Sequence, residues 1–409
     1  MDVLCFEHSE RNVSFYEKVA LVSPLRTAVG SFNKSLAPLS APELGATVMT
    51  ACLQQSKLEP ALIDQIYLGN VLQAGNGQNP ARQAALKAGI PIDVPETTIN
   101  TVCGSGLHAV ALAYNSILAE QGDIVLAGGM ESMSNAPYLL RNARNGYKLG
   151  NGELVDCLVA DGLTCPINNY HMGITAENVA EKYGISRLEQ DEFAYESQIK
   201  ALDAKNKKVF EGQIVPVMIK NKKETIYFTE DEHIRGNTTK EKLATLKTAF
   251  KENGTVTAGN ASGINDGAAA MLVVSEDKCK EHELKPLAYI KGYSLVGVDP
   301  AYMGMGPVKA ISTLLKQQGM SIDDIDLFEI NEAFAAQAIA VMKELGVNPE
   351  KANVNGGAIA IGHPVGASGA RILVTLVHEM VRRSSRYGIA SLCIGTGMGI
   401  AMLVENALI

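Results

Sequence analysis

The sequence predicts an α/β protein built from two copies of one strand and helix unit, with a different segment inserted between them. Strand-like runs alternate with helical ones, as in "KVALVSPLR", "APELGATVMTACLQQ" and "IDQIYLGNV", and this alternation is typical of parallel sheets covered by helices. The pattern then recurs, because I-D-x-I-x-L stands both at Ile63 and at Ile322. Between the two copies lies a stretch that is richer in charge and in loops.

In the first copy, a β-branched run from Thr97 to Val102 leads into a helical spacing of apolar residues that begins at Leu107. In the second copy, an extended, glycine-rich run leads into a helix within residues 353–380. Each copy then closes with a strand and a glycine turn, "DIVLAGGMESMS" in the first and "IASLCIGTGMGIAM" in the second. Because three successive elements agree, we interpret the chain as a duplication whose loops meet at the same end of the sheets.

The inserted stretch contains loops such as "NARNGYKLGNGE" and "IKNKKETIYFTEDEHIRGNTT". We expect it to lie over the ends of the strands and to shape a substrate site. The predicted division is an N-terminal tail at 1–17, a first half at 18–133 plus 264–286, a loop domain at 134–263, and a second half at 287–409.

Composition excludes several classes of protein. The net charge of -8 argues against a nucleic-acid binder, because such domains are usually basic. No apolar run reaches the length of about 18 residues that a membrane span needs. The seven cysteines form no CxxC pair, which is typical of a reduced, intracellular protein. The N-terminus lacks the pattern of a secretory signal. We therefore expect a cytoplasmic protein without nucleic-acid or membrane partners.

Cys103 stands in "NTVCGSGLHAV", between the predicted strand and the predicted helix. A thiol beside the first amides of a helix experiences the positive end of the helix dipole, which lowers the ordinary cysteine pKa of about 8.5 by a unit or more. Gly104 and Gly106 let a ligand approach the backbone closely. The segment therefore predicts a reactive thiol, although a small buried core cysteine fits it equally well.

Three other segments place polar groups at corresponding strand ends. "GHP" brings His363 to the loop of the second half that corresponds to the Cys103 loop, where an imidazole would accept the proton of the thiol. "CIGTGMG" brings Cys393 to the end of a strand, and "NEAFAAQ" offers Asn331, an uncharged donor that is better explained as a helix N-cap when the segment is taken alone. The chain has no GxSxG, no P-loop and no dinucleotide fingerprint.

At this point the sequence resembles the thiolase family, and among its members the biosynthetic, acetyl-CoA-condensing type. Seven motifs in order carry the resemblance: "NTVCGSGLHAV", "GGMESMS", "HMGITAEN", "VTAGNASGINDGAAA", "NEAFAAQ", "NVNGGAIAIGHPVGASGARI" and "CIGTGMGIAM". The resemblance extends from about Lys18 to the end of the chain. It implies a five-layer αβαβα sandwich of two βαβαβαββ halves with an inserted loop domain.

The resemblance also implies roles for five residues. Cys103 would be the nucleophile that takes an acyl group from acyl-CoA, and His363 would activate it and bind the thioester oxygen. Cys393 would act as general acid and base on the second acetyl-CoA. Asn331 would hold the water of one oxyanion hole, and the amides of Cys103 and Gly395 would form the other.

Coenzyme A enters this implied reaction as substrate and product, with no further cofactor and no metal. Its anionic groups need local positive charge, which "IKNKKETIYFTEDEHIR" offers. In relatives, the residue that matches Arg235 contacts the adenine end of coenzyme A. A solvated lysine run is the alternative interpretation for each lysine taken singly. The implied substrate-binding residues are His171, Met172, Lys222, Lys223, Arg235, Phe250, Ala258, Gly259, Ser262, Ala333 and Phe334.

The expected activity is that of an acetyl-CoA C-acetyltransferase, which converts two acetyl-CoA into acetoacetyl-CoA and CoA. The alternative is a broader 3-ketoacyl-CoA thiolase of fatty-acid degradation. A non-catalytic carrier and a decarboxylating ketoacyl synthase fit less well, because both cysteines, the histidine and the asparagine are present together. "LLRNARNGYKLGN" matches the tetramerisation loop of relatives and implies a homotetramer. Thr396, Met398 and Ile234 depart from the usual motifs.

Overall fold

The computed structural model describes residues 18–220 and 224–409, so the predicted tail at 1–17 lies outside the described residues. The main sheet has the strand order β15-β16-β17-β14-β1-β13-β5-β3-β4, with β10 beside β1 and β2 beside β13. The strands are β1 (Val19–Thr27), β2 (Gly30–Ser31), β3 (Gln65–Gly69), β4 (Glu96–Ile99), β5 (Ile124–Ser132), β6 (Tyr138–Leu139), β7 (Val155–Asp156), β8 (Thr164–Cys165), β9 (Tyr170–His171), β10 (Ile214–Val215), β11 (Val217–Lys220), β12 (Thr225–Phe228), β13 (Asn265–Ser275), β14 (Pro286–Gly297), β15 (Leu327–Ile330), β16 (Tyr387–Ile394) and β17 (Met398–Asn406).

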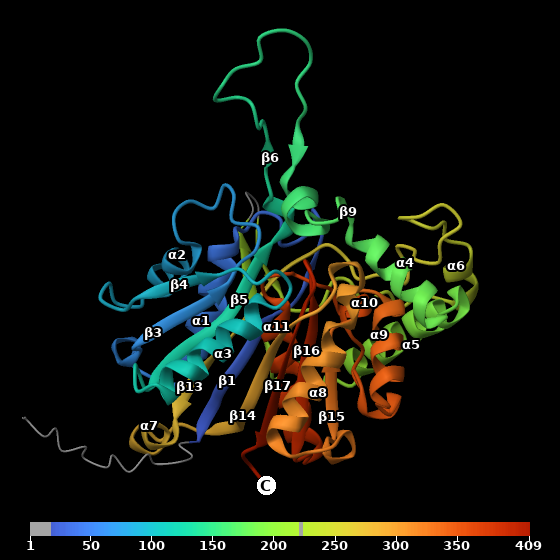
Figure 1. Cartoon of the computed structure of the whole chain (residues 1–409). Helices are drawn as coiled ribbons and strands as arrows, with labels where there is room; N and C mark the ends of the chain where they lie inside the picture. The colour runs from blue at the N-terminus through green and yellow to red at the C-terminus, as the bar shows by residue number, and fades with distance from the viewer. Residues whose placement is uncertain (1–17, 221–223) are drawn as a thin grey trace, which may run out of the picture.

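Helices cover both faces of this sheet (Figure 1). They are α1 (Ala41–Ser56), α2 (Pro80–Lys87), α3 (Ser105–Leu118), α4 (Met172–Tyr183), α5 (Arg187–Asn206), α6 (Lys240–Ala244), α7 (Glu276–Glu281), α8 (Gly306–Gln318), α9 (Ala335–Leu345), α10 (Ala358–Ile361) and α11 (Ser368–Arg383). Local chemistry explains where several of them begin. At α1, for example, Ser40 and Glu43 form a reciprocal capping box, and Pro42 stands in the first turn.

The duplication read from the sequence is present as a repeated order of elements. In the first half, α1 is followed by a short 3-10 turn (Pro60–Leu62) and β3, and in the second half α8 is followed by such a turn (Ile322–Asp324) and β15. The helices α3 and α11 precede β5 and β16, which pair antiparallel with β13 and β17. The halves join edge to edge, because β1 pairs antiparallel with β14.

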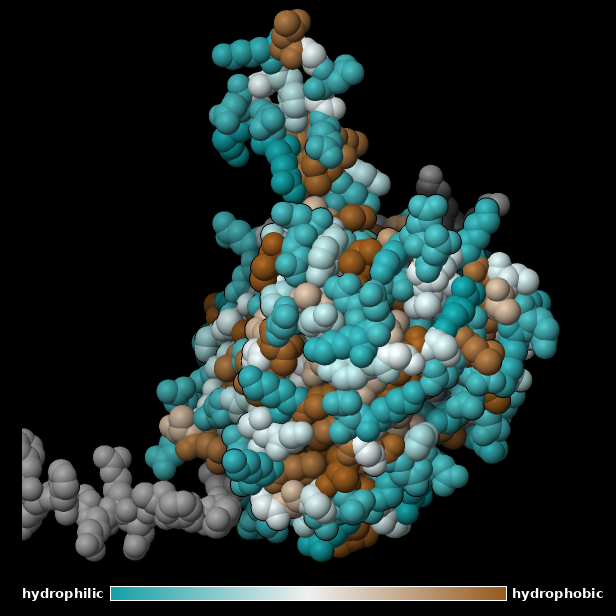
Figure 2. Space-filling model, turned by 45° about the vertical axis from the view of Figure 1, so that its right-hand side comes forward, coloured by the Kyte–Doolittle hydropathy of each residue, from teal (hydrophilic) through white to brown (hydrophobic). Residues whose placement is uncertain are grey.

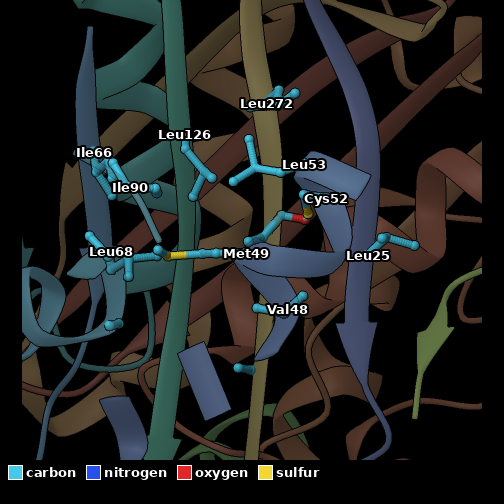
Figure 3. Packing of buried hydrophobic residues seen from close by; sticks show 14 of the residues in the cluster. Leu25, Val48, Met49, Cys52, Leu53, Ile66, Leu68, Ile90, Leu126 and Leu272 are labelled. Carbon is cyan, nitrogen blue, oxygen red and sulfur yellow. The ribbon is translucent and has the colours of Figure 1, made fainter. Parts of the chain in front are cut away.

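Three clusters of buried side chains define five layers. The first cluster joins α1 and α2 to one face of the first half, where Met49 and Leu53 of α1 pack near Leu126 and Leu272 (Figure 3). The second cluster contains α3 and α11 together with strands of both halves, and the third joins α8 and α9 to the outer face of the second half. The order is therefore α1 and α2, first-half strands, α3 and α11, second-half strands, α8 and α9, which confirms the predicted αβαβα sandwich.

Most residues of the two central helices are buried, as expected for helices that lie between two layers of the protein. Ala370, Ile372, Leu373, Val374, Leu376 and Val377 of α11 are all buried. Because α3 and α11 lie between the halves, the loops that precede them open toward the same region. The parallel strands β3, β4 and β5 of the first half, and β15 and β16 of the second, end there as well. Carboxyl ends of parallel strands are the usual place for a site in such folds.

The stretch between the halves forms a hairpin that projects from the body and a group of helices beside the second half (Figure 1). The short strands β6 and β7 pair antiparallel at the base of the hairpin. Hydrophobic side chains are visible at its tip and along its length (Figure 2). Helix α5 packs against α9 and α10. Within the described ranges, no helix is long and apolar enough to cross a membrane.

Candidate active site

Cys103 lies in a tight turn between β4 and α3, with Gly104 at the N-cap of the helix. Val102, directly before it, has a φ of 45°, a left-handed conformation that is strained for a β-branched residue. The hydroxyl of Ser105 holds this turn, because it donates to Val102 O at 2.6 Å and accepts from Thr101 N at 2.8 Å. Cys103 as a whole residue is half-buried.

The environment of Cys103 corrects one expectation from the sequence. Burial raises its pKa to about 11, although the backbone N–H of Gly395 donates to the sulfur and acts in the opposite direction. The negative charge of Glu131 raises it further. The prediction that the helix N-terminus lowers this pKa is therefore wrong for the free protein, because loss of solvent outweighs the nearby amides. At neutral pH the resting group is a thiol.

Cys393 lies near the carboxyl end of β16 and is completely buried. It packs in one cluster with Cys165, Met172, Ala333 and Phe334. Burial raises its pKa far above the ordinary cysteine value, and the neighbouring Cys103 adds to the rise. The resemblance implies a general acid and base at this position. The free protein holds a neutral thiol, which can donate a proton before it accepts one.

His363 follows α10 and precedes α11. Its Nδ1 lies 2.5 Å from the hydroxyl of Ser368, and this hydroxyl donates its one proton to Pro364 O at 2.8 Å. Nδ1 therefore carries the ring proton and Nε2 is the acceptor. Burial, with a smaller effect from the charge of Arg371, lowers the pKa of His363 to about 3. The imidazole is neutral, as a general base must be.

Asn331 is the first residue after β15, and its side chain reaches His363. Its Nδ2 lies 3.5 Å from Nε2 of the imidazole, and its buried Oδ1 has no hydrogen-bond partner among the described residues. The helix-cap interpretation of Asn331 is wrong, because α9 begins at Ala335 with Phe334 as its N-cap. An amide with one free oxygen beside a neutral imidazole is suited to hold a water molecule.

The two halves bring these groups together. The Gly395 amide contacts the Cys103 sulfur, and a Cβ at Gly104 would lie only 2.5 Å from Cδ1 of Ile394. Cys103 also packs against the cluster that contains Val365, two residues after His363. The predicted meeting of the Cys103 loop with the loops of the second half is therefore present in the structure.

A cleft of about 540 Å³ reaches His363. The predicted residues Cys103, Asn331, Cys393 and Gly395 are not among those that line it. The walls of the cleft include eight of the predicted residues, which are His171, Met172, Arg235, Phe250, Ala258, Ser262, Phe334 and His363. Gly259 and Ala333 are not among the lining residues: Gly259 packs against Leu243 and Leu246, and Ala333 packs in the cluster of Cys393. Lys222 and Lys223 lie outside the described residues. The cleft wall is partly aromatic, because His171 stacks on Phe250 with ring centroids 4.5 Å apart.

The cleft also contains residues that the sequence analysis did not identify. Lys34 lies in the loop after β2 and lines the cleft together with Phe32, Glu232 and His233. Among the described residues, Lys34 and Arg235 are the two cations that line the cleft, and no ion pair between described residues involves either of them. A lysine isolated in a loop carries no spacing signal, so its place beside the cleft depends on the fold.

Thr396, which the sequence analysis noted as a departure, lies in the turn between β16 and β17. Its φ is 71°, a conformation that glycine adopts without strain and a β-branched residue does not. Its hydroxyl contacts the carbonyl of Gly395. Gly397, the next residue, has a φ of 92°. The turn that presents the Gly395 amide to Cys103 thus contains two successive left-handed residues, one of them a threonine.

The sequence matches two family models along almost all of the described chain. Residues 19–277 match "Thiolase, N-terminal domain" and residues 284–406 match "Thiolase, C-terminal domain". An acetyl-CoA acetyltransferase of Chromobacterium violaceum is 56% identical over 390 residues, which is 95% of this chain and 100% of the relative. An acetyl-CoA acetyltransferase of Escherichia coli is 56% identical over 387 residues, 94% of this chain and 98% of the relative.

A solved structure agrees with these matches. The crystal structure of an acetyl-CoA acetyltransferase of Bacillus anthracis superposes with a TM-score of 0.94 and 45% sequence identity. The superposition covers 95% of this chain and 99% of that one. Both the sequence and the arrangement of layers are thus shared along nearly the whole length, and the chain belongs to the thiolase family.

Proposed function

We propose that this protein is an acetyl-CoA C-acetyltransferase. It condenses two acetyl-CoA reversibly into acetoacetyl-CoA and CoA, with the first acetyl group held on Cys103. The observation that carries the proposal is the meeting of the Cys103 thiol with the Gly395 amide and Cys393. A neutral His363 hydrogen-bonded to Asn331 lines the cleft and supplies the base. Relatives with this name share more than half of their residues with the chain over nearly its full length.

In the first half-reaction, the Cys103 sulfur attacks the carbonyl carbon of acetyl-CoA while its proton passes to Nε2 of His363. The C–S bond to coenzyme A then breaks, and the leaving thiolate takes the proton of Cys393. The products are an acetyl-cysteine and free CoA, and the protein keeps an imidazolium and a thiolate. Two protonated thiols and a neutral imidazole are the starting state that this step requires.

In the second half-reaction, the Cys393 thiolate removes an α-proton from the second acetyl-CoA. The carbanion attacks the acetyl-cysteine, and the Cys103 sulfur leaves and recovers its proton from His363. Each step develops negative charge on a thioester oxygen, and a preorganised hydrogen-bond donor there typically lowers the activation barrier by about 2.7–4 kcal/mol. We propose that the amides of Cys103 and Gly395 donate hydrogen bonds to one of these oxygens. His363 and a water molecule held by Asn331 would donate to the other.

The mass of the intact protein tests the covalent step. After incubation with acetyl-CoA and removal of small molecules, we expect the mass to increase by one acetyl group, and the Cys103→Ala variant to show no adduct. Cys393→Ser serves as the matched variant, because it keeps the nucleophile and should therefore accumulate the adduct without forming acetoacetyl-CoA. An adduct that persists in Cys103→Ala would overturn the assignment of the nucleophile.

The runner-up is the broader 3-ketoacyl-CoA thiolase. His171 and Phe250 close part of the cleft wall by stacking, which favours a short acyl group. Thiolysis rates should be measured on 3-ketoacyl-CoA substrates of increasing chain length. A steep fall after the shortest substrates supports the acetyl-specific activity, and a flat profile would replace it with the broader one.

We also propose that the protein is a cytoplasmic homotetramer that uses coenzyme A as substrate and product, without another cofactor. The projecting hairpin supports the assembly, because it exposes large apolar side chains that a monomer would leave in water. Tyr138, Leu140, Leu149 and Leu154 are all more than half exposed, and Leu149 completely so. Light scattering should report four copies, and replacing residues 140–153 with a short Gly-Ser link should yield dimers. Monomeric full-length protein would contradict this assembly.

A further inference from the structure

Glu131 is a buried carboxylate beside the proposed active site to which the mechanism gives no role. It is the penultimate residue of β5 and is completely inaccessible to solvent. No lysine, arginine or histidine forms an ion pair with it in the described chain. An unpaired buried carboxylate is costly unless hydrogen bonds compensate for its lost solvation, so its partners should explain why it is there.

Backbone and side-chain donors occupy both oxygens. Oε1 accepts from Asn70 Nδ2 at 2.7 Å and from Leu72 N at 3.2 Å, and Oε2 accepts from Val71 N at 3.0 Å and from Gly366 N at 2.9 Å. A carboxylate has about four acceptor sites, so all of its capacity is used. The donors come from two places, the segment after β3 in the first half and the His363 loop in the second.

The backbone of the His363 loop lies directly on the strands of the first half. A Cβ at Gly129 would lie 2.1 Å from Gly366 O, and a Cβ at Gly69 would lie 2.6 Å from the same atom. Only glycine permits this approach. The Glu131 carboxylate also lies directly against Gly366, because its Oε2 would be 2.6 Å from a Cβ at that position.

The segments that Glu131 holds form the apolar surface behind the nucleophile. Val71, Leu72 and Val365 belong to one cluster, and Cys103 packs against it. Glu131 accepts from the amides of Val71 and Leu72 and from Gly366, the neighbour of Val365. Displacing the carboxylate would therefore shift both the surface behind the thiol and the loop that carries the imidazole.

We propose that Glu131 is a positioning residue. Its carboxylate holds the His363 loop of the second half against the segment after β3 in the first half, which packs behind Cys103. It does not line the substrate cleft, so it acts on alignment and not on binding. Burial raises the pKa of Glu131 itself to about 7, so the group is ionised at pH 8. Its charge then has a second effect, because it opposes ionisation of Cys103 before substrate arrives. The other titratable groups that act on this pair are Asp266 on β13, which acts on Glu131, and Cys393 on β16, which neighbours Cys103.

The inference rests on the proposed function, and two variants separate alignment from charge. Glu131→Gln keeps the size but replaces one acceptor oxygen by a donor, and Glu131→Asp keeps the charge but shortens the reach. Both should lower kcat at least tenfold and leave the KM for acetyl-CoA within twofold of wild type. A kcat of Glu131→Gln within twofold of wild type would overturn the proposal.

Alkylation of Cys103 by iodoacetamide at pH 8, followed by peptide mass, needs no substrate and separates the two effects. Glu131→Gln should react several-fold faster than wild type, and Glu131→Asp should react at the wild-type rate. Equal rates in all three proteins would refute the electrostatic effect. If wild type alkylates as expected but does not turn over acetyl-CoA, the proposed function fails and the alkylation result still stands.

Two further variants guard against misinterpretation. Asp64→Asn removes a carboxylate that accepts the amides of Asp123 and Ile124 at the opposite end of β5, and it should leave kcat unchanged. Asn70→Ala removes a single donor to Glu131, and it keeps the test open if Glu131→Gln does not fold. We expect it to lower kcat several-fold, and an unchanged kcat would contradict the positioning role.

Discussion

The hydroxyl of Ser368 holds the imidazole of His363 in the tautomer that carries its proton on Nδ1, at 2.5 Å. The arrangement depends on Pro364, whose carbonyl takes the only proton of the hydroxyl. Ser368 is completely buried in the first turn of α11, so no solvent replaces it. The base function proposed for His363 therefore depends on a residue that never contacts the substrate.

Ser368→Ala should lower kcat by about 10-fold to 100-fold with little change in KM, because the buried N–H loses an acceptor at a cost of about 1–3 kcal/mol. Steady-state kinetics of condensation provide the measurement. Ser294→Ala, which removes another buried hydroxyl bonded to a backbone carbonyl, should leave kcat unchanged. A Ser368→Ala enzyme with wild-type turnover would show that the tautomer is held by other means.

Thr396→Gly should stabilise the protein. The left-handed conformation of a residue with a Cβ costs roughly 1–2 kcal/mol, and the added freedom of glycine in the unfolded chain returns about 0.4–1 kcal/mol of this. We expect a net gain of about 0.5–1 kcal/mol, measured as a higher midpoint of thermal unfolding. Thr396→Ala is the control, because it keeps a Cβ at the same φ of 71°. Equal midpoints for the two variants would disprove the strain.

The sequence predicted the duplicated units and the meeting of loops because both follow from local patterns, whereas the five-layer order was implied by the resemblance to the thiolase family. Periodicity marks the strands and helices, and the repeated I-D-x-I-x-L motif indicates the duplication, so Cys103, His363, Asn331 and Cys393 fall at equivalent strand ends. The division into an N-terminal half, a loop domain and a C-terminal half stays a prediction. So do the catalytic roles, which await the variants described above.

The protonation states could not be predicted in the same way. The helix start that should favour a thiolate at Cys103 is present, but the pKa depends on how much solvent the surrounding segments exclude, and these come from both halves of the chain. The role proposed for Glu131 could not be predicted for the same reason, because its hydrogen-bond donors at Asn70 and Gly366 become neighbours only after folding.

Lys34 and Arg235 should each contribute to coenzyme A binding, because both line the cleft and neither pairs with a carboxylate of the part of the chain that the structure describes. We expect Lys34→Gln to raise the KM for acetyl-CoA about three-fold to ten-fold at low salt, and less at high salt because the Debye length falls from about 30 Å to about 3 Å between 0.01 M and 1 M. Initial rates across a salt series test this. Lys316→Gln on the outer helix α8 is the matched control. If Lys34→Gln does not change the KM, the anionic groups of coenzyme A do not bind near Lys34.

We expect acid to destabilise the protein through protonation of His233. Burial, with smaller effects from the charges of Arg235 and Lys34, lowers the pKa of His233 to about 4, against about 6.5 in an unfolded chain. Between these values the unfolded state binds the proton and the folded state does not. The stability that His233 contributes is therefore present above pH 6.5 and is lost as the pH falls toward 4.

At pH 5 this loss amounts to about 2 kcal/mol, since one pKa unit corresponds to about 1.4 kcal/mol. His233→Gln has no group to protonate, so the difference between its free energies of unfolding at pH 7 and at pH 5 should be smaller than that of wild type by about this amount. Urea unfolding at the two pH values provides the measurement. The other buried histidine, His363, titrates equally in both proteins and cancels in the comparison. An identical pH dependence in the two proteins would mean that folding does not lower the pKa of His233, which would contradict the prediction.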